Sequence, residues 1–147
     1  FFHCNIKTLN LIPSVVATQK AKEAGCQECV FYRPGGRVTE CAHSNVQMLK
    51  DGCFVTHPAD NHILPGIARK HLIQACMALE IPVVEKLFTL DELKDADEVI
   101  VSSSSTLCLP IQSIDGLPVG GKDEELLDKL RSYVMQECDT YIAEHRA

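Results

Sequence analysis

Apolar and polar positions along the chain alternate between a helical and a strand-like spacing. An amphipathic helix needs apolar residues three or four positions apart, whereas a half-buried strand needs them at every second position. The helical spacing predicts helices at residues 11–23, 67–79, 90–96 and 123–144. Strand-like runs lie between them, at residues 1–6, 29–32, 37–39, 45–49, 53–56, 81–84, 98–101 and 106–114. Without a linker or an internal repeat, this alternation predicts a single domain of mixed α/β class over residues 1–147.

Capping and turn residues mark several of the predicted boundaries. Asn10 is expected to cap the first helix and Gly25 to stop it. Thr89, with Glu92 three positions later, predicts a capping box before the short helix. Lys50-Asp51-Gly52 separates two strand-like runs and predicts a hairpin.

Composition and charge exclude several classes of protein. The chain has 147 residues, 46% of them hydrophobic, which suffices for one domain with an apolar core. Its 20 acidic residues outnumber 14 basic ones, so we expect no nucleic-acid partner. No apolar run is long enough to span a bilayer and no signal peptide is visible, so we expect no membrane contact. Because the chain begins at Phe1, we expect it to be a piece of a longer protein.

Eight cysteines are spread along the chain without a regular spacing. Cys26 and Cys29 form one close pair, but no second CxxC or HxxxH motif completes a zinc set. Cys53, Cys76 and Cys108 lie in apolar runs, where a thiol acts as a small hydrophobic group. The pattern favours reduced structural thiols in a cytoplasmic protein over a metal site.

Lys7 ends the first apolar run and is the first candidate for chemistry. A lysine amine must be uncharged to attack an aldehyde, and removal from water disfavours the charged ammonium. We therefore expect Lys7 to be partly buried. The alternative is an ordinary lysine whose aliphatic stem covers apolar surface.

Glu40 ends the β-branched run Val38-Thr39. A carboxylate beside a pyridine nitrogen keeps that ring protonated, so the ring can accept an electron pair from a substrate. The alternative is a solvated glutamate in a turn.

Residues 63–69 resemble a cup for a phosphate. Gly66 allows close approach of the backbone, and the amides of Ile67 and Ala68 open a predicted helix whose dipole favours an anion. Leu64 could lie against a flat ring. Hydroxyl groups at residues 102–105 could add donors, although serine runs are more often plain loops. The alternative for the cup is an apolar loop before a core helix.

Together, an amine, a carboxylate and a helix N-terminus indicate a pyridoxal-phosphate site. Their surroundings resemble the C-terminal domain of class IV, fold-type-IV pyridoxal-phosphate aminotransferases, most closely D-amino-acid (D-alanine) aminotransferase. Branched-chain aminotransferases and aminodeoxychorismate lyase are relatives within that group. The matching segments lie between about Cys4 and Gly120 and are Ile6-Lys7-Thr8-Leu9-Asn10-Leu11, Val38-Thr39-Glu40, Ser44-Asn45, Thr56-His57-Pro58-Ala59-Asp60, Ile63-Leu64-Pro65-Gly66-Ile67 and Ala96-Asp97-Glu98-Val99.

The resemblance implies a β pseudo-barrel flanked by helices. It also implies a homodimer whose active site is completed by a smaller N-terminal domain that this chain lacks. An amino group would pass from an amino acid, of the D-alanine type, to a 2-oxo acid. By resemblance, the residues that hold the cofactor are Lys7 at the aldehyde, Glu40 at the ring nitrogen, Leu64 at the ring face, and Gly66, Ile67, Ala68, Ser104 and Ser105 at the phosphate. Lys7 would also move the proton at the substrate α-carbon.

Departures from the family pattern leave the substrate open. His43 in Cys41-Ala42-His43 stands where small residues are usual, Ala68 where a threonine is common, and Asn5 where an aspartate is common. We expect His43 to alter substrate preference sterically. An aminodeoxychorismate-type lyase and a non-catalytic assembly module remain alternatives, and the fragment alone is expected to have weak or no turnover.

Overall fold

The computed structural model describes residues 3–145 and confirms the mixed α/β class. Its centre is a five-stranded sheet with the strand order β5-β4-β3-β6-β7. Neighbouring strands run antiparallel except for β4 and β5, which are parallel. The strands of this sheet are β3 (Asn45–Lys50), β4 (Cys53–Thr56), β5 (Val83–Glu85), β6 (Glu98–Ser103) and β7 (Thr106–Ile111).

Two small antiparallel sheets accompany the central one. The first pairs β1 (Val30–Arg33) with β2 (Arg37–Cys41), and the second pairs β8 (Ser113–Ile114) with β9 (Leu117–Pro118). Among residues 3–145 these strands form three separate sheets and do not close into one barrel.

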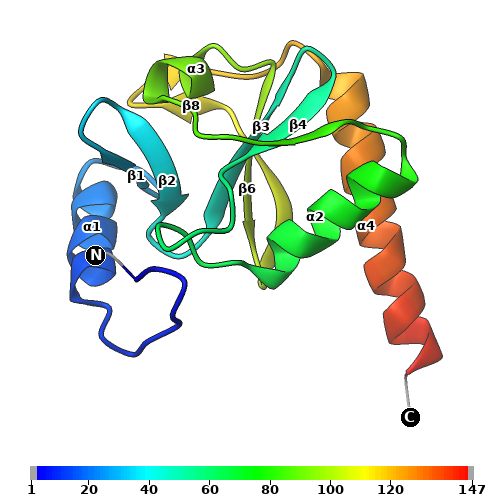
Figure 1. Ribbon diagram of the computed structural model, residues 1–147, viewed down its shortest axis with the longest axis horizontal. Helices are drawn as coiled ribbons and strands as arrows, with labels where there is room; N and C mark the ends of the chain where they lie inside the picture. The colour runs from blue at the N-terminus through cyan, green and yellow to red at the C-terminus, as the bar shows by residue number, and fades with distance from the viewer. Residues whose placement is uncertain (1–2, 146–147) are drawn as a thin grey trace.

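The helices divide between two sides of the molecule. Figure 1 shows α2 (Ile67–Ala78) and α4 (Glu124–Glu144) side by side at the central sheet, and α1 (Ile12–Glu23) next to the β1–β2 hairpin, far from α4. The short α3 (Leu90–Lys94) lies near β8. Because β4 and β5 are parallel, the chain between them must cross from one end of the sheet to the other. Helix α2 is part of this crossover.

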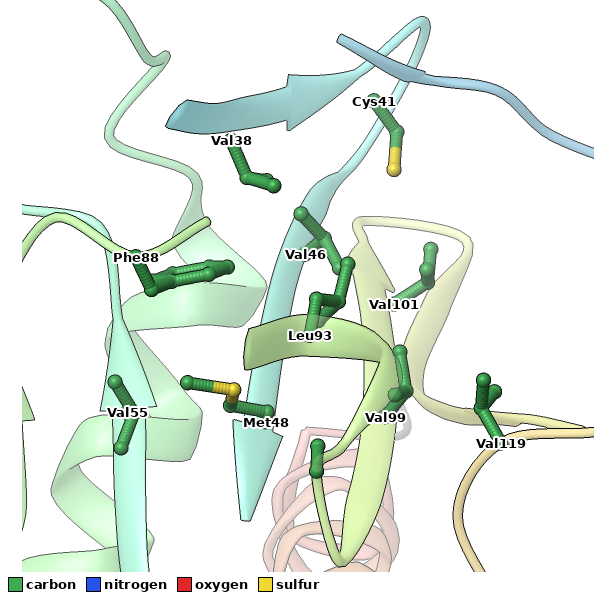
Figure 2. Close-up of a cluster of buried hydrophobic side chains, with 11 residues drawn as sticks. Val38, Cys41, Val46, Met48, Val55, Phe88, Leu93, Val99, Val101 and Val119 are labelled. Carbon is green, nitrogen blue, oxygen red and sulfur yellow. The ribbon is translucent and has the colours of Figure 1, made fainter. Parts of the chain in front are cut away.

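Alternation along β3 and β6 sends side chains into two apolar clusters, one on each face of the sheet. One cluster contains Val46 and Met48 of β3 and Val99 of β6, covered by Leu93 of α3 (Figure 2). The opposite cluster contains Leu49 and lies under α2 and α4; its other central members are Phe54, Leu72, Cys76, Ile100 and Leu130.

Several predicted boundaries are confirmed because their signals are local. Asp51 and Gly52 both adopt positive φ angles in the β3–β4 turn, 51° and 73°, as a two-residue hairpin turn requires. Thr89 and Glu92 form the predicted capping box. Gly25, with φ of 73°, follows the end of α1.

Two predictions near the N-terminus are wrong. Asn10 does not cap the first helix: the N-cap residue is Leu11, without a side-chain hydrogen bond, and the helix starts at Ile12. The strand predicted for residues 1–6 is also wrong over its described part, since residues 3–10 form turns and irregular backbone. A strand needs a partner, and here one Cys4 N–H bond to the Asn61 carbonyl oxygen (2.9 Å) takes the place of a ladder. Residues 1 and 2 lie outside the described residues.

All eight cysteines are free thiols. Within residues 3–145, no helix combines the length and the apolar character that crossing a bilayer demands.

Candidate active site

A cleft of about 570 Å³ lies where the N-terminal segment, the β1–β2 hairpin, the loop before α2 and the end of β6 meet. In Figure 1 the N-terminal segment and α1 are blue and the hairpin is cyan. The cleft brings together most of the predicted site residues: Lys7, Glu40, Leu64, Gly66, Ile67, Ala68 and Ser104. Ser105 is not among the lining residues.

Lys7 lines this cleft from an irregular segment and is exposed, so the expected partial burial is wrong for the described chain. The reason is that its neighbours are not covered either: Ile6 is 57% exposed and Leu9 is 99% exposed.

Glu40, near the end of β2, lines the cleft and is held in place by a backbone hydrogen bond. Its Oε2 accepts a hydrogen bond from the backbone N–H of Leu64 (2.8 Å). Burial raises the pKa of the Glu40 carboxyl, while the Leu64 N–H and a hydrogen bond with the Cys4 thiol act in the opposite direction. A positive charge brought next to this carboxyl would be a strong partner, because the carboxyl is already partly desolvated.

Both backbone polar groups of Leu64, its N–H and its carbonyl oxygen, are hydrogen-bonded. Its N–H donates to Glu40, and its carbonyl oxygen accepts from Asn45 Nδ2 (2.9 Å) and from the Gly66 N–H (2.8 Å). The half-buried Leu64 side chain lines the cleft on this fixed backbone. A flat apolar ring could therefore rest on it without reordering the loop.

Gly66 is the N-cap residue of α2, and no side chain caps this end of the helix. The first turn thus leaves amide donors free, and those of Ile67 and Ala68 belong to residues that line the cleft. A Cβ on Gly66 would overlap Asn45 Oδ1, so glycine is needed for space. This arrangement is a cradle for an anion.

Arg69, in the same helical turn, is buried and does not point into the cleft. Its guanidinium donates to Thr56 Oγ1 (3.0 Å), the His57 carbonyl oxygen (2.9 Å) and Glu85 Oε2 (2.7 Å). These bonds tie the start of α2 to β4 and β5, which fixes the direction of the helix N-terminus.

The serine run divides at the end of β6. Ser102 and Ser103 are strand residues, whereas Ser104 and Ser105 form the turn before β7. Ser102, Ser103 and Ser104 line the cleft. Ser105 instead shares a hydrogen bond with Ser103 through their hydroxyl groups (3.2 Å). Of the two serines predicted at the phosphate, Ser104 lines the cleft and Ser105 does not.

Basic side chains outnumber acidic ones around the cleft. Lys7 and Arg33 line it, and Glu40 is the one carboxylate among the lining residues. His43 is exposed, with Nε2 2.9 Å from Thr18 Oγ1 of α1. Although the chain has a net charge of −6, this region suits an anionic ligand. Sequence analysis assigned no role to Arg33 or Cys4, and it included Asn45 only as part of the Ser44-Asn45 family segment.

The donor set fits an aldehyde whose nitrogen ring and phosphate are held by separate groups. An amine, a partly buried carboxylate, a supported leucine and free helix amides face one cleft. Among the residues that the structure describes, no group of three histidine, cysteine or acidic side chains could hold a metal ion.

Comparison with known proteins gives a consistent result. Residues 1–114 match the Amino-transferase class IV family. D-alanine aminotransferase of Listeria monocytogenes is 42% identical over 93% of this chain and 47% of that protein. A branched-chain aminotransferase of Thermobaculum terrenum, solved in its PLP-form, is 28% identical with a TM-score of 0.78, over 91% of this chain and 46% of that one. A candidate 4-amino-4-deoxychorismate lyase of Legionella pneumophila is 26% identical with a TM-score of 0.84, over 90% and 49%.

The chain thus spans about half the length of the proteins it matches. The sequence match includes every residue named above as lining the cleft, and the similarity in structure extends over most of the fold. The chain belongs to the class IV aminotransferase family.

Proposed function

We propose that this chain is the cofactor-binding part of a pyridoxal-phosphate aminotransferase that moves an amino group between an amino acid and a 2-oxo acid. The observation that supports this most is the convergence of Lys7, Glu40 and the N-terminus of α2 on one cleft. The similarity to D-alanine aminotransferases makes a D-amino acid of the alanine type our first candidate substrate.

The roles proposed for the residues follow from their chemistry. When bound, the cofactor supplies an electron-accepting ring that stabilises negative charge at the substrate α-carbon. Lys7 Nζ holds the cofactor covalently and, once displaced by the substrate, accepts and returns the α-proton. Glu40 holds positive charge at the ring nitrogen, and Leu64 supports the ring. The amides of Ile67 and Ala68, with the Ser104 hydroxyl, bind the phosphate.

The rest of the working enzyme is also part of the proposal. We propose a homodimer completed by a smaller N-terminal domain, which would cover the exposed segment around Lys7. We propose the cytoplasm as its location, since eight free thiols suit a reducing compartment. Small-molecule amino and oxo acids are its expected partners.

The test is a transamination assay with D-alanine and 2-oxoglutarate, following pyruvate, on the longer protein to which this chain belongs. Lys7→Ala should abolish turnover, and undiminished activity would sink the assignment. Glu40→Gln should reduce turnover at least tenfold while changing cofactor affinity much less, because the electron-accepting role needs a full negative charge. Equal losses in both would contradict that role.

A lyase of the aminodeoxychorismate type is the second candidate, favoured by the structural similarity to the Legionella protein. Such an enzyme would release pyruvate from its substrate without any 2-oxo acid acceptor. Pyruvate formed from aminodeoxychorismate in the absence of an acceptor would therefore select the lyase, and strict dependence on the acceptor would select the aminotransferase.

A further inference from the structure

Gln47, in the middle of β3, has no role in the site described so far. Its side chain is fully buried, at 0% exposure. Nε2 donates a hydrogen bond to Ser102 Oγ (2.9 Å), whereas Oε1 has no partner among residues 3–145. A buried acceptor without a donor destabilises a fold, so stability alone does not explain this glutamine.

The position of Gln47 on the sheet is informative. On this face of the sheet, β3 presents Asn45, Gln47 and Leu49 in turn. Asn45 pairs with Ser102 of β6, and Gln47 pairs with Thr56 of β4. This face of β3 is therefore apolar at Leu49 and polar at Gln47 and Asn45, and Asn45 is the residue that contacts Gly66 at the start of α2.

Ser102 stands between Gln47 and the cleft. It lines the cleft and lies across from Asn45, whose Oδ1 packs under Gly66 at the start of α2. Its oxygen already accepts the Gln47 hydrogen bond, and Gln47 is its one hydrogen-bond partner in the described chain. Its hydroxyl hydrogen therefore has no acceptor among the described residues, and Ser102 shares the lining of the cleft with Ile67 and Ala68.

We propose that Gln47 is a positioning residue that holds Ser102 as a hydrogen-bond donor to a phosphate group at the N-terminus of α2. The inference rests on the proposed function for the identity of the ligand, the phosphate of the cofactor. Ser102 belongs to the serine run that the sequence offered as possible donors, whereas the family resemblance assigned only Ser104 and Ser105 to the phosphate. The unpartnered Oε1 follows from this arrangement, because an amide that used Oε1 to accept from Ser102 would consume the hydrogen that the phosphate needs.

The test compares two probes, pyridoxal phosphate and pyridoxal, which differ only in the phosphate. Their dissociation constants are measured by absorbance titration of the 147-residue chain, and the ratio of the two isolates the phosphate contribution. Ser102→Ala should lower the preference for the phosphorylated probe about tenfold, as expected for one charge-assisted hydrogen bond. Ser102→Thr should restore it, since a hydroxyl is kept.

Gln47→Met, which keeps the length of the side chain without its amide, should lower the same preference about threefold. In the Ser102→Ala background it should have no further effect, because Gln47 acts through Ser102. The melting temperature of the unliganded chain should stay unchanged or rise, since the unpartnered Oε1 is removed.

Ser44→Ala is the matched control and should leave the preference unchanged. Ser44 also lines the cleft, but its hydroxyl donates to Glu28 Oε2 (2.8 Å).

An unchanged or increased preference in Gln47→Met would overturn the proposal, because the hydroxyl would then donate to the glutamine in the unliganded protein. Additive losses in the double variant, or a loss accompanied by a lower melting temperature, would reduce Gln47 to a structural residue.

Failure of the proposed function gives a different signature. If pyridoxal does not react with Lys7, the cofactor role fails, and the affinity for inorganic phosphate, from ³¹P NMR line widths, becomes the readout for the same variants. Weaker phosphate binding in Ser102→Ala and Gln47→Met would then support the inference on its own. No phosphate binding by the unsubstituted chain would overturn it.

Discussion

Asn45 Oδ1 lies against Gly66 so closely that a Cβ on Gly66 would overlap it. The backbone of Gly66, with φ of −65° and ψ of 144°, is open to any residue, so the requirement for glycine here is one of space. The same asparagine donates through Nδ2 to the Leu64 carbonyl oxygen (2.9 Å). One side chain from the central sheet therefore sets both the loop and the start of α2.

Gly66→Ala should lower the free energy of unfolding by about 1–3 kcal/mol, the usual cost of adding a methyl group to a filled site. Urea denaturation followed by circular dichroism measures this. Adding Asn45→Ala should recover part of the loss, because the overlapping oxygen is removed, although the Leu64 bond is lost too. Purely additive effects would show that the two residues do not meet in this way.

Glu98 is buried at 3% exposure, and its two oxygens accept the backbone N–H groups of Gly121 (3.1 Å) and Asp123 (2.9 Å), just before α4. Glu98→Ala should lower the free energy of unfolding by about 3 kcal/mol, because two amides lose a charged acceptor. Glu92→Ala, which removes only the exposed carboxylate of the capping box, should cost about 1 kcal/mol in the same denaturation experiment. If the two variants lose equal stability, the role of Glu98 is overestimated.

Burial raises the pKa of the Glu40 carboxyl, and this gives stability a specific pH dependence. The folded chain then binds this proton more tightly than the unfolded one, so the contribution of Glu40 is full at low pH and is lost as pH rises through the folded pKa. Glu40→Gln does not titrate, and its oxygen can still accept the Leu64 N–H. The measured quantity is the melting temperature of the variant minus that of the unsubstituted chain. This difference should be on the order of 2 °C larger at pH 7 than at pH 4. A gain confined to pH 4 would contradict the sign.

The cysteines should separate by reactivity. Burial raises the pKa of Cys76 to about 12 and that of Cys108 to about 11, and it raises the pKa of Cys41 still further. Cys26 is exposed. A chromogenic disulfide reagent at pH 8 should modify Cys26 first and leave the three buried thiols unreacted until the chain unfolds. Mass mapping of each modified thiol checks the order, and early labelling of Cys76 or Cys108 would show that the apolar cluster under α2 and α4 opens locally.

Local sequence patterns predicted much of this fold. They missed the features that depend on contacts between distant parts of the chain. The capping box of Thr89 and the Asp51-Gly52 turn were predictable because each depends on residues next to one another. That Lys7, Glu40 and the loop before α2 would lie at one site was predictable, because their residue types and order resemble a known family. The exposure of Lys7 was not, since it depends on what covers residues 3–10 rather than on their own sequence.

The remaining features of the site come from strand pairing. Ser102 of β6 is far along the chain from Asn45 and Gln47 of β3, and it meets them only because β3 pairs with β6. Nothing in the spacing of Gln47 marks it as buried beside a cleft, since a glutamine in a strand-like run indicates a solvated face. Glu98 is a similar case. Sequence analysis recognised its family segment, but its hydrogen bonds to Gly121 and Asp123 before α4 could not be predicted, because those residues are distant in the sequence.

The most direct test of the central claim is covalent trapping of pyridoxal phosphate on Lys7. The chain is incubated with the cofactor, reduced with borohydride, digested and mapped by mass spectrometry, with Lys7→Ala as the matched variant. The account predicts a visible absorbance band before reduction and a pyridoxyl group on Lys7, with Lys20 and Lys22 of α1 unmodified. Labelling spread evenly over these three lysines, or labelling undiminished in Lys7→Ala, would contradict it.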